Sequence, residues 1–380
     1  MPGTVLFVAS TWSHIVNFHL PYLRAFRQMG WTVHAACGGE RRDIPEAELC
    51  CQLPFEKNMT SPANFRAQAL LRRLMHAQRY DLVCVHTSLA AFFTRRAAAA
   101  LRPRPVLVNM AHGYLFDDST PPLKKTVLLA AERLTAPQTD LLLTMNRYDY
   151  DEAVRRRLGR RMVNIPGVGV NFSPLDAPTP ADRIALRRRL DITESDFLLI
   201  YAAEFSSRKH QSTLIDALSL LPDRVKLCLP GSGALLEDCK AQAHCLGVAD
   251  RVRFPGFVSD MPVWYAAADG AVTSSRSEGL PFNVMESMYC GLPVVATAVK
   301  GHTDLIDHGR TGLLYPFGDA EGCAAQIRRL LEEPGLAAAL GEAARASMAP
   351  YSLPEVLPRV MELYCSVLPE RLRPRIPVPL

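Results

Sequence analysis

The sequence predicts an α/β protein built from two doubly wound domains, each with a parallel sheet between layers of helices. Short apolar runs alternate with longer helical patterns in the N-terminal half and again from residue 198 onward, as in βαβ units. At 380 residues the chain is too long for one ordinary core and fits two domains. We expect a first domain at 1–168, a linker at 169–181, a second domain at 182–350, and a C-terminal helix and tail at 351–380 that return toward the first domain.

The first domain is expected to contain short buried strands, because its apolar runs are rich in Val, Leu and Ile and are bounded by polar residues, Gly or Pro. These strands are Val5–Ala9, Thr32–Ala36, Leu82–Val85, Val106–Met110, Leu141–Thr144 and Val163–Ile165. Helical spacing between them predicts helices at His19–Met29 and Phe65–Gln78. A run of Gly, Pro and Asp from Pro166 to Pro180 then interrupts the pattern and indicates the linker.

The second domain repeats the alternation. The expected strands are Leu198–Ala202, Lys226–Leu229, Val252–Phe254, Asp269–Ser275 and Val294–Thr297, with helices at Ser212–Leu220 and Ala234–Cys245. A further helix should begin at Pro281, because proline suits a first helical position, and should end near Gly291. The tail from Leu368 is rich in Pro and Arg and is expected to be a loose strap or disordered.

Composition excludes several classes of protein. The chain has no apolar run of 18 residues and no basic leader before its first strand, so we expect no spanning helix, no signal peptide and a cytoplasmic location. Ten cysteines without a CxxC pair indicate reduced thiols. The net charge is +5, and a basic face would suit an anionic membrane surface, although a solvated helix surface explains any single Arg as well. Arg is concentrated at Arg66, Arg72, Arg73, Arg79, Arg95, Arg96, Arg102 and Arg104. No module typical of nucleic-acid binding is present.

Two glutamates, Glu278 and Glu286, are the strongest candidates for function. Glu278 lies in the loop after a predicted strand, and Glu286 lies inside the helix that follows. The start of such a helix can bind a nucleotide diphosphate, because its N–H groups and its dipole favour anions. A carboxylate can accept hydrogen bonds from two neighbouring hydroxyls, so Glu286 suits the ribose of a nucleotide and Glu278 a second sugar. The simpler alternative is two ordinary acids near a helix N-terminus.

Other segments at strand ends add weaker signals. Gly231 and Gly233 form a turn that would let backbone approach a ligand. His112 follows the strand Val106–Met110, although a lone histidine is more often structural. No Asp-x-Asp pair follows a strand, since Asp117-Asp118 lies in a Pro-rich loop and Asp149–Asp151 in a helical stretch. We therefore expect no metal ligands.

Taken together, these segments resemble the retaining, nucleotide-sugar-dependent glycosyltransferases of family 4, which have the GT-B fold of two Rossmann-like domains facing each other across a cleft. The resemblance spans nearly the whole chain, and the paired-glutamate segment is its most specific part. The other supporting segments are Ser13–Leu23, Ala111–Gly113, Pro166–Val170, Gly291–Thr297 and Gly309–Leu314. The N-terminal ones resemble the bacterial subgroup that builds capsule and exopolysaccharide.

The resemblance implies roles for individual residues. Glu286 would hold the ribose and Glu278 the donor hexose, while Arg208 and Lys209 would offset charge on the leaving diphosphate. His112 would lie near the donor sugar. The remaining implied contacts are Gly231, Gly233, Phe257, Val258, Leu280 and Pro281 for the nucleotide and His14 for the acceptor. Glu204 stands where many members carry Arg, so one usual phosphate cation is absent.

The expected function is transfer of a hexose or N-acetylhexosamine, with retention, from a UDP-sugar, or as second choice a GDP-sugar, to a polyprenyl-diphosphate-linked or saccharide acceptor. The family's chemistry would be front-face transfer without a metal or other cofactor. Lys124 and Lys125 border the apolar Val127–Ala131, which suggests peripheral attachment to the inner membrane face, or else a helix buried in the core. Other possibilities are a nucleotide-sugar epimerase or hydrolase of the same architecture and a non-catalytic assembly scaffold.

Overall fold

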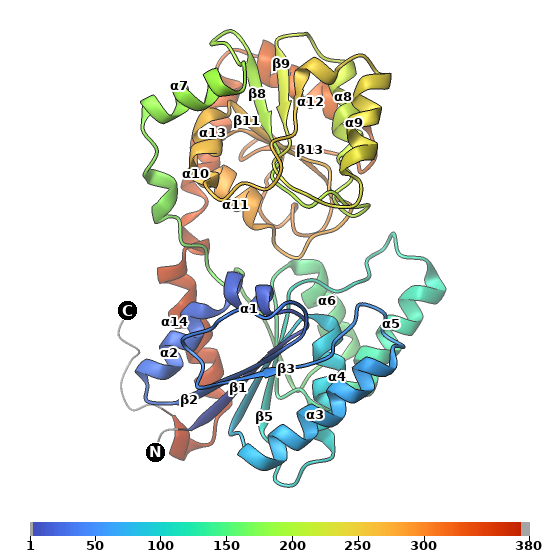
Figure 1. Ribbon diagram of the computed structural model, residues 1–380, viewed down its shortest axis with the longest axis vertical. Coiled ribbons are helices and arrows are strands. Elements are labelled where there is room, and N and C mark those ends of the chain that lie inside the picture. Colours follow the sequence, from blue (N-terminus) through green and yellow to red (C-terminus); the bar gives the residue numbers. More distant parts are fainter. Residues whose placement is uncertain (1–2, 374–380) are drawn as a thin grey trace. The chain divides into compact units, whose positions relative to one another are not determined.

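The computed structural model describes residues 3–373 and divides into two compact units. Unit 1 comprises Met1–Gly169 and Pro354–Leu380, and unit 2 comprises Val170–Leu353 (Figure 1). Each unit has its own parallel sheet with helices on both faces (Figure 1). The predicted α/β class with two doubly wound domains is therefore confirmed.

The sheet of unit 1 has seven parallel strands in the order β3-β2-β1-β4-β5-β6-β7. The strands are β1 (Thr4–Ala9), β2 (Thr32–Cys37), β3 (Leu49–Gln52), β4 (Leu82–His86), β5 (Val106–Ala111), β6 (Leu141–Thr144) and β7 (Arg161–Asn164). The strand order reverses between β1 and β4, the kind of switch point where such sheets bind ligands. Strand β3 was not predicted, because this edge strand is only half-buried and has no continuous apolar run.

The helices of unit 1 are α1 (Trp12–Phe18), α2 (Leu20–Gln28), α3 (Pro62–Gln78), α4 (Ser88–Ala99), α5 (Pro122–Thr135), α6 (Arg147–Arg156) and α14 (Leu353–Ser366). The helix predicted at His19–Met29 corresponds to α2, whereas α1 was not predicted. His19 separates α1 from α2, and Pro21 lies in the first turn of α2, where its missing N–H costs no hydrogen bond. His14 lies in α1.

The C-terminal helix α14 packs on unit 1. The Tyr364 ring is fully buried and stacks on Phe26 of α2, with ring centroids 5.9 Å apart. Leu368 and Leu372 are also buried. The first part of the tail is therefore packed, which corrects the expectation of a loose strap, whereas residues 374–380 lie outside the described part of the chain.

The sheet of unit 2 has six parallel strands in the order β10-β9-β8-β11-β12-β13. The strands are β8 (Phe197–Ile200), β9 (Val225–Cys228), β10 (Val252–Arg253), β11 (Gly270–Thr273), β12 (Val294–Thr297) and β13 (Leu313–Tyr315). The helices are α7 (Pro180–Arg189), α8 (Ser212–Ser219), α9 (Leu236–Cys245), α10 (Met261–Ala267), α11 (Phe282–Tyr289), α12 (Ala320–Glu332) and α13 (Leu336–Ala346). Pro281 caps α11 instead of forming its first residue.

The segment predicted as a linker is partly ordered into helix. It contains a short 3-10 turn at Ser173–Asp176 and the first residues of α7. Helix α7 begins at Pro180 because Thr179 and Asp182 form a capping box, in which each side chain accepts a hydrogen bond from the backbone of the other residue. The end of the predicted linker is therefore the fixed start of helix α7, which belongs to unit 2.

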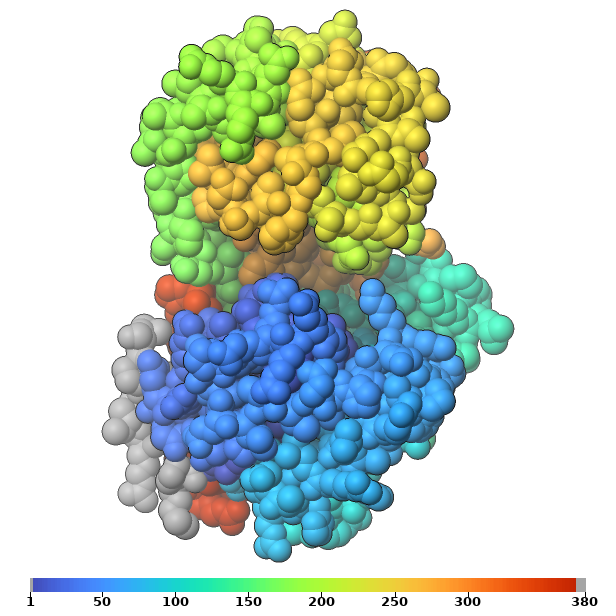
Figure 2. All heavy atoms as spheres, viewed as in Figure 1, coloured from blue at the N-terminus to red at the C-terminus, as the bar shows by residue number. Residues whose placement is uncertain are grey.

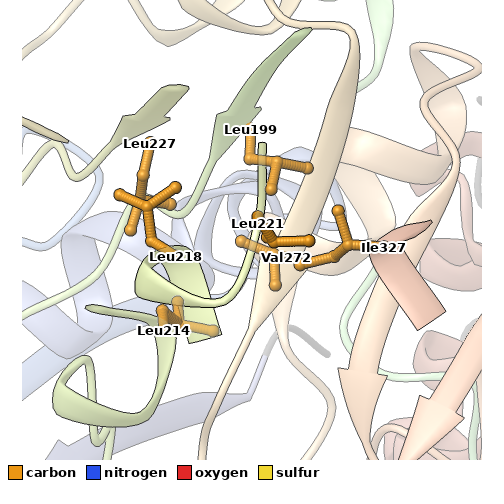
Figure 3. Close-up of a pocket in the computed structure, with 7 residues that line it drawn as sticks. All are labelled: Leu199, Leu214, Leu218, Leu221, Leu227, Val272 and Ile327. Carbon is orange, nitrogen blue, oxygen red and sulfur yellow. The ribbon is translucent and has the colours of Figure 1, made fainter. Parts of the chain in front are cut away.

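The core of unit 2 is mainly aliphatic, with the buried rings of Tyr201, Phe205 and Tyr315 among its members. A small void in this core is lined by Leu199, Leu214, Leu218, Leu221, Leu227, Val272 and Ile327 (Figure 3). These residues belong to strands β8, β9 and β11, helices α8 and α12, and the loop after α8, and their side chains point toward one another (Figure 3). Because the lining has no polar group, the void is a packing feature and not a ligand site.

Arg95 does not belong to the predicted basic surface. Its side chain is fully buried on α4, and its Nη2 lies 2.6 Å from Oε2 of Glu132 on α5. A buried guanidinium requires such a partner, so Arg95 joins two helices. Its neighbour Arg96 is exposed. Within residues 3–373, no helix has both the length and the apolar composition needed to cross a bilayer.

Candidate active site

Glu278 is the centre of a buried ion cluster in unit 2. Its side chain is only 7% exposed, and Lys209 Nζ lies 2.5 Å from Oε1 while Arg208 Nη1 lies 2.8 Å from Oε2. Glu278 lies in the loop after β11, and the two cations lie in the loop after the neighbouring strand β8. Parallel strands end at one edge of a sheet, and this is why residues 70 positions apart meet here.

The loop that carries the cations is fixed to the end of β11. The carbonyl of Lys209 accepts hydrogen bonds from the hydroxyl of Ser274, at 2.9 Å, and from that of Tyr201, at 3.4 Å. The backbone N–H of Arg276 donates to the carbonyl of Arg208 at 2.8 Å. The positions of both charges are therefore set by backbone contacts and do not depend on flexible side chains alone.

The cluster keeps Glu278 ionised. Burial raises the pKa of a carboxyl group, but the charges of Lys209 and Arg208 outweigh burial and lower the pKa of Glu278 to about 2. Two cations lie beside one carboxylate, so the cluster carries a net positive charge. Such a site favours an anionic ligand such as a diphosphate.

Sequence reasoning missed His302 and Gly301, which complete the surroundings of Glu278. His302 is fully buried after β12, and its Nδ1–H donates to the carbonyl of Thr297 at 2.9 Å. Burial lowers the pKa of His302 to about 4, so the ring is neutral. Gly301 has φ +83°, and a Cβ there would lie 2.9 Å from the Cβ of Glu278. The available signal was a Gly-His pair after a predicted strand, at the same sheet edge.

Glu286 lies on α11 and has a different environment. The hydroxyl of Tyr265 on α10 donates a hydrogen bond to Oε2 of Glu286 at 2.9 Å. Burial raises the pKa of Glu286, and the hydrogen bond from Tyr265 only partly opposes this rise. A carboxylate has about four acceptor positions, so one tyrosine leaves capacity for the two hydroxyls of a ribose. The two glutamates therefore differ in their electrostatic surroundings, since Glu278 has two cations beside it and Glu286 has a tyrosine hydroxyl.

Gly231 and Gly233 form a tight contact with the loop after β8. Their φ angles are +149° and +153°, and a Cβ on either residue would collide with the carbonyl of Ala203 or Phe205. The N–H of Phe205 donates to the carbonyl of Ser232 at 2.9 Å. The fold therefore requires glycine at both positions, because only residues without a Cβ let the turn after β9 pack against the loop that carries the cations.

The other residues assigned to the nucleotide lie at the same edge of the sheet. Phe257 follows β10 and is 81% exposed, and Val258 is half-buried. Leu280 and Pro281 are buried at the start of α11. Glu204 is exposed, and its carbonyl accepts a hydrogen bond from Gln211. The roles of these residues toward a ligand stay predictions.

In unit 1, His14 and His112 belong to a cluster of four histidines. His19 Nε2 lies 3.4 Å from His14 Nε2 and 3.2 Å from His112 Nε2, and His112 Nε2 lies 3.4 Å from Nδ1 of His86. Burial lowers the pKa of each ring, that of His14 to about 4, so all four are neutral at pH 7. The sequence predicted His112 and His14 as candidate site residues, but not that they lie together. His86, the last residue of β4, was not predicted as a candidate.

Comparison with known proteins places this geometry in a family. Residues 20–167 match the family described as glycosyl transferase 4-like domain, and residues 182–347 match glycosyl transferases group 1. The protein EpsD of Bacillus subtilis (strain 168), which bears a glycosyltransferase name, is 32% identical over 373 residues, covering 97% of this chain and 98% of EpsD. D-inositol 3-phosphate glycosyltransferase of Xylanimonas cellulosilytica is 29% identical and covers 78% of this chain and 69% of its own length.

Solved structures show the same fold. Anabaena HepE in complex with UDP and glucose matches with a TM-score of 0.79 at 22% identity, covering 96% of this chain and 100% of HepE. Sucrose-phosphate synthase from Thermosynechococcus elongatus matches with a TM-score of 0.80 at 21% identity, covering 96% of this chain and 99% of the synthase. One family match falls on each unit, and EpsD is similar over nearly its full length, so the chain is a GT-B glycosyltransferase of the family with group 1 and 4-like domains.

Proposed function

We propose that this glycosyltransferase moves a hexose or N-acetylhexosamine, with retention of configuration, from a UDP-sugar to a lipid-linked or saccharide acceptor in cell-surface polysaccharide synthesis. The observation that supports it best is the ion cluster of Glu278, Lys209 and Arg208 at the sheet edge of unit 2. Similarity to EpsD, which bears a glycosyltransferase name, supports the transfer reaction.

The ion cluster suggests how the donor is bound. Without a ligand, Lys209 and Arg208 satisfy Glu278, and an arriving diphosphate offers the two cations stronger charge-assisted partners. If the cations turn toward the phosphates, the oxygens of Glu278 become available to the hydroxyls of the donor sugar. Binding of the diphosphate and binding of the sugar would then be coupled through one exchange of partners.

The expected chemistry is front-face transfer. Glu278 is engaged by two cations and Glu286 by a tyrosine, so neither is arranged as a free nucleophile beside a protonated acid. The departing phosphate would accept the proton of the attacking hydroxyl, while Lys209 and Arg208 stabilise the negative charge that develops on it. His112 is proposed to contact the donor sugar and His14 the acceptor. On this mechanism, transfer needs no metal.

We propose UDP as the nucleotide of the sugar donor. HepE, which shares the fold over 96% of this chain, has been solved with UDP and with UDP-glucose. A panel of UDP- and GDP-sugars, read by release of the nucleotide diphosphate, tests the proposal with wild type, Glu286→Ala and Lys209→Ala. Lys240→Ala is the matched control, since Lys240 pairs with Glu237, at 2.8 Å on the surface of α9. We expect wild type to release the nucleotide diphosphate from one donor, and both site variants to lose this activity. EDTA should not affect it. No release from any donor would favour the alternative of a non-catalytic assembly scaffold.

We also propose that the protein attaches to an anionic membrane surface through α5. Leu123, Val127 and Leu134 on this helix are 79%, 61% and 68% exposed, and Lys124 is exposed beside them. Figure 2 shows the segment, in teal, at the surface of unit 1. Exposed apolar side chains next to a cation match the amphipathic surfaces that bind the lipid interface.

Flotation with vesicles that contain phosphatidylglycerol tests this attachment. Val127→Asp and Lys124→Glu should each reduce the floated fraction. Ile184→Asp is the control, because Ile184 is a similarly exposed aliphatic residue on α7 of unit 2, at 54% exposure. Equal flotation of all variants would contradict attachment through α5.

A further inference from the structure

The four histidines of unit 1 converge from separate segments of the chain. His86 ends β4, His112 follows β5, and His14 and His19 lie on α1 and at its end, directly after β1. One ring nitrogen from each histidine belongs to a set whose members all lie within 4.8 Å of one another. His19 and His86 are fully buried, and His14 and His112 are partly exposed. The cluster therefore combines two fully buried histidines with two that are less buried.

Hydrogen bonding among the rings does not account for these contacts. A neutral imidazole has one N–H and one lone pair, and each ring nitrogen can serve one good hydrogen bond. The Nε2 atoms of His19 and His112 each face two other ring nitrogens at 3.2–3.4 Å. At most two of the three contacts can be well-formed hydrogen bonds at one time. In addition, the second nitrogens of His19 and His86, Nδ1 and Nε2 respectively, are buried without a hydrogen-bond partner among the described residues.

The geometry points to a binding site for a divalent late transition metal ion, Zn²⁺ in particular, ligated by Nε2 of His14, His19 and His112 and by Nδ1 of His86. Zn–N bonds of roughly 2.0–2.1 Å in a tetrahedron place ligand nitrogens about 3.3–3.4 Å apart. Three of the distances between these nitrogens, 3.4, 3.2 and 3.4 Å, agree with this spacing, and one ring nitrogen of each histidine lies within 4.8 Å of those of the others. A cation at the centre would use all four lone pairs at once, which the hydrogen-bonded arrangement cannot do.

The four imidazole ligands also limit which ions can bind and how tightly they are held. Imidazole suits Zn²⁺, Cu²⁺ and Ni²⁺, whereas Mg²⁺ and Ca²⁺ require oxygen ligands. Ligating histidines usually donate their second nitrogen to a carboxylate or carbonyl, and losing such a partner costs roughly 10–100-fold in affinity. Within residues 3–373, the second nitrogens of His19 and His86 have no such partner. The ion is therefore bound exchangeably and is not a permanent part of the fold.

This site does not depend on the proposed transfer reaction. Because His14 and His112 are also proposed to contact the substrates, an ion at the cluster would occupy the same lone pairs. Zinc would then act as an inhibitor of transfer and not as a cofactor. EDTA should leave the activity unchanged or raise it.

Binding of Co²⁺ to tag-free, EDTA-treated protein provides the test, since tetrahedral Co²⁺ absorbs visible light and reports directly on its ligands. We expect one Co²⁺ per chain, displaced by one Zn²⁺. His14→Gln and His19→Gln should each weaken binding by at least about tenfold, the smallest loss typical of removing even an outer partner. His76→Gln is the control, because His76 is exposed on α3 and outside the cluster.

Circular dichroism and the melting temperature establish that the variants are folded. His19 is fully buried, so if His19→Gln fails to fold, the partly exposed His14 decides the test. Absence of a visible Co²⁺ spectrum in wild type would mean that the rings form a metal-free hydrogen-bonded network, and the proposal would be overturned. Binding by His14→Gln equal to that of wild type would also overturn it.

Discussion

Replacement of Lys209 by Met is the most informative perturbation of the proposed donor site. Methionine keeps most of the length of the side chain and removes only the charge. Lys209 is 12% exposed, and its Nζ lies 2.5 Å from Oε1 of Glu278. Because the pair is buried, solvent does not screen the lost interaction as it would for a surface pair. Arg208 would remain as the single cation.

The expected loss follows from the role assigned to this charge. A fixed donor aimed at charge that develops in the transition state contributes on the order of 3 kcal/mol, which corresponds to about 10²-fold in kcat/KM. If Lys209 acts mainly on the leaving diphosphate, kcat should fall more than KM rises. If it only binds the donor, the change should appear in KM alone.

The assay is steady-state release of UDP from the preferred donor, with kcat and KM determined separately. Lys209→Arg keeps the charge and should retain much more activity than Lys209→Met. Lys240→Met, at the exposed Lys240–Glu237 pair, should behave as wild type. A folded Lys209→Met enzyme with kcat/KM within about threefold of wild type would refute the electrostatic role, since that change is below 1 kcal/mol.

Three further predictions concern pH and backbone. The pKa of Glu278 is lowered from 4.5 to about 2, so its carboxylate stabilises the fold above pH 4.5 and loses this effect as pH falls toward 2; in urea unfolding, wild type should lose about 2 kcal/mol more than Glu278→Gln between pH 7 and pH 3. Tyr265→Phe removes a hydrogen bond that lowers the pKa of Glu286, so Glu286 becomes protonated at a higher pH in the variant. As the pH is lowered, UDP affinity, measured by calorimetry, should therefore begin to decline at a higher pH than in wild type. Gly233→Ala places a Cβ against the carbonyl of Phe205 at φ +153° and should lower stability by about 2 kcal/mol, measured by the same unfolding method.

The fold could be predicted because both sheets are parallel and buried. Their strands are continuous apolar runs such as Val5–Ala9, and a parallel sheet requires the helical crossovers that the spacing showed. The edge strand β3 could not be found in this way, because only buried strands need unbroken apolar sequence. The short helix α1 was also not predicted, and it ends at His19, a polar residue whose side chain is buried among other histidines.

The candidate site was predictable where a local motif carried it. Glu278 and Glu286 share one loop and helix, so the sequence placed them correctly relative to each other. The ion pair between Glu278 and Lys209 was not predicted, because the sequence assigned the two residues to different parts of the donor. They meet because parallel strands end at one edge of a sheet. The histidine cluster depends on the neighbouring strands β1, β4 and β5, and nothing local to His86 indicated which other rings it meets.

The two units place opposite chemistry at equivalent positions of their sheets. In unit 2 the loops after β8 and β11 bring charges together, and burial of Glu278 is tolerated because Lys209 and Arg208 balance it. Any ligand that binds there must replace that pairing, which an anionic diphosphate can do and a neutral sugar cannot. In unit 1 the loops after β1, β4 and β5 bring neutral rings together, which need no counterion and have lone pairs to offer. Such a cluster accepts a hydroxyl proton or a metal cation and repels neither. Under the proposed function, the diphosphate of the donor is therefore expected to bind in unit 2, and the metal ion in unit 1.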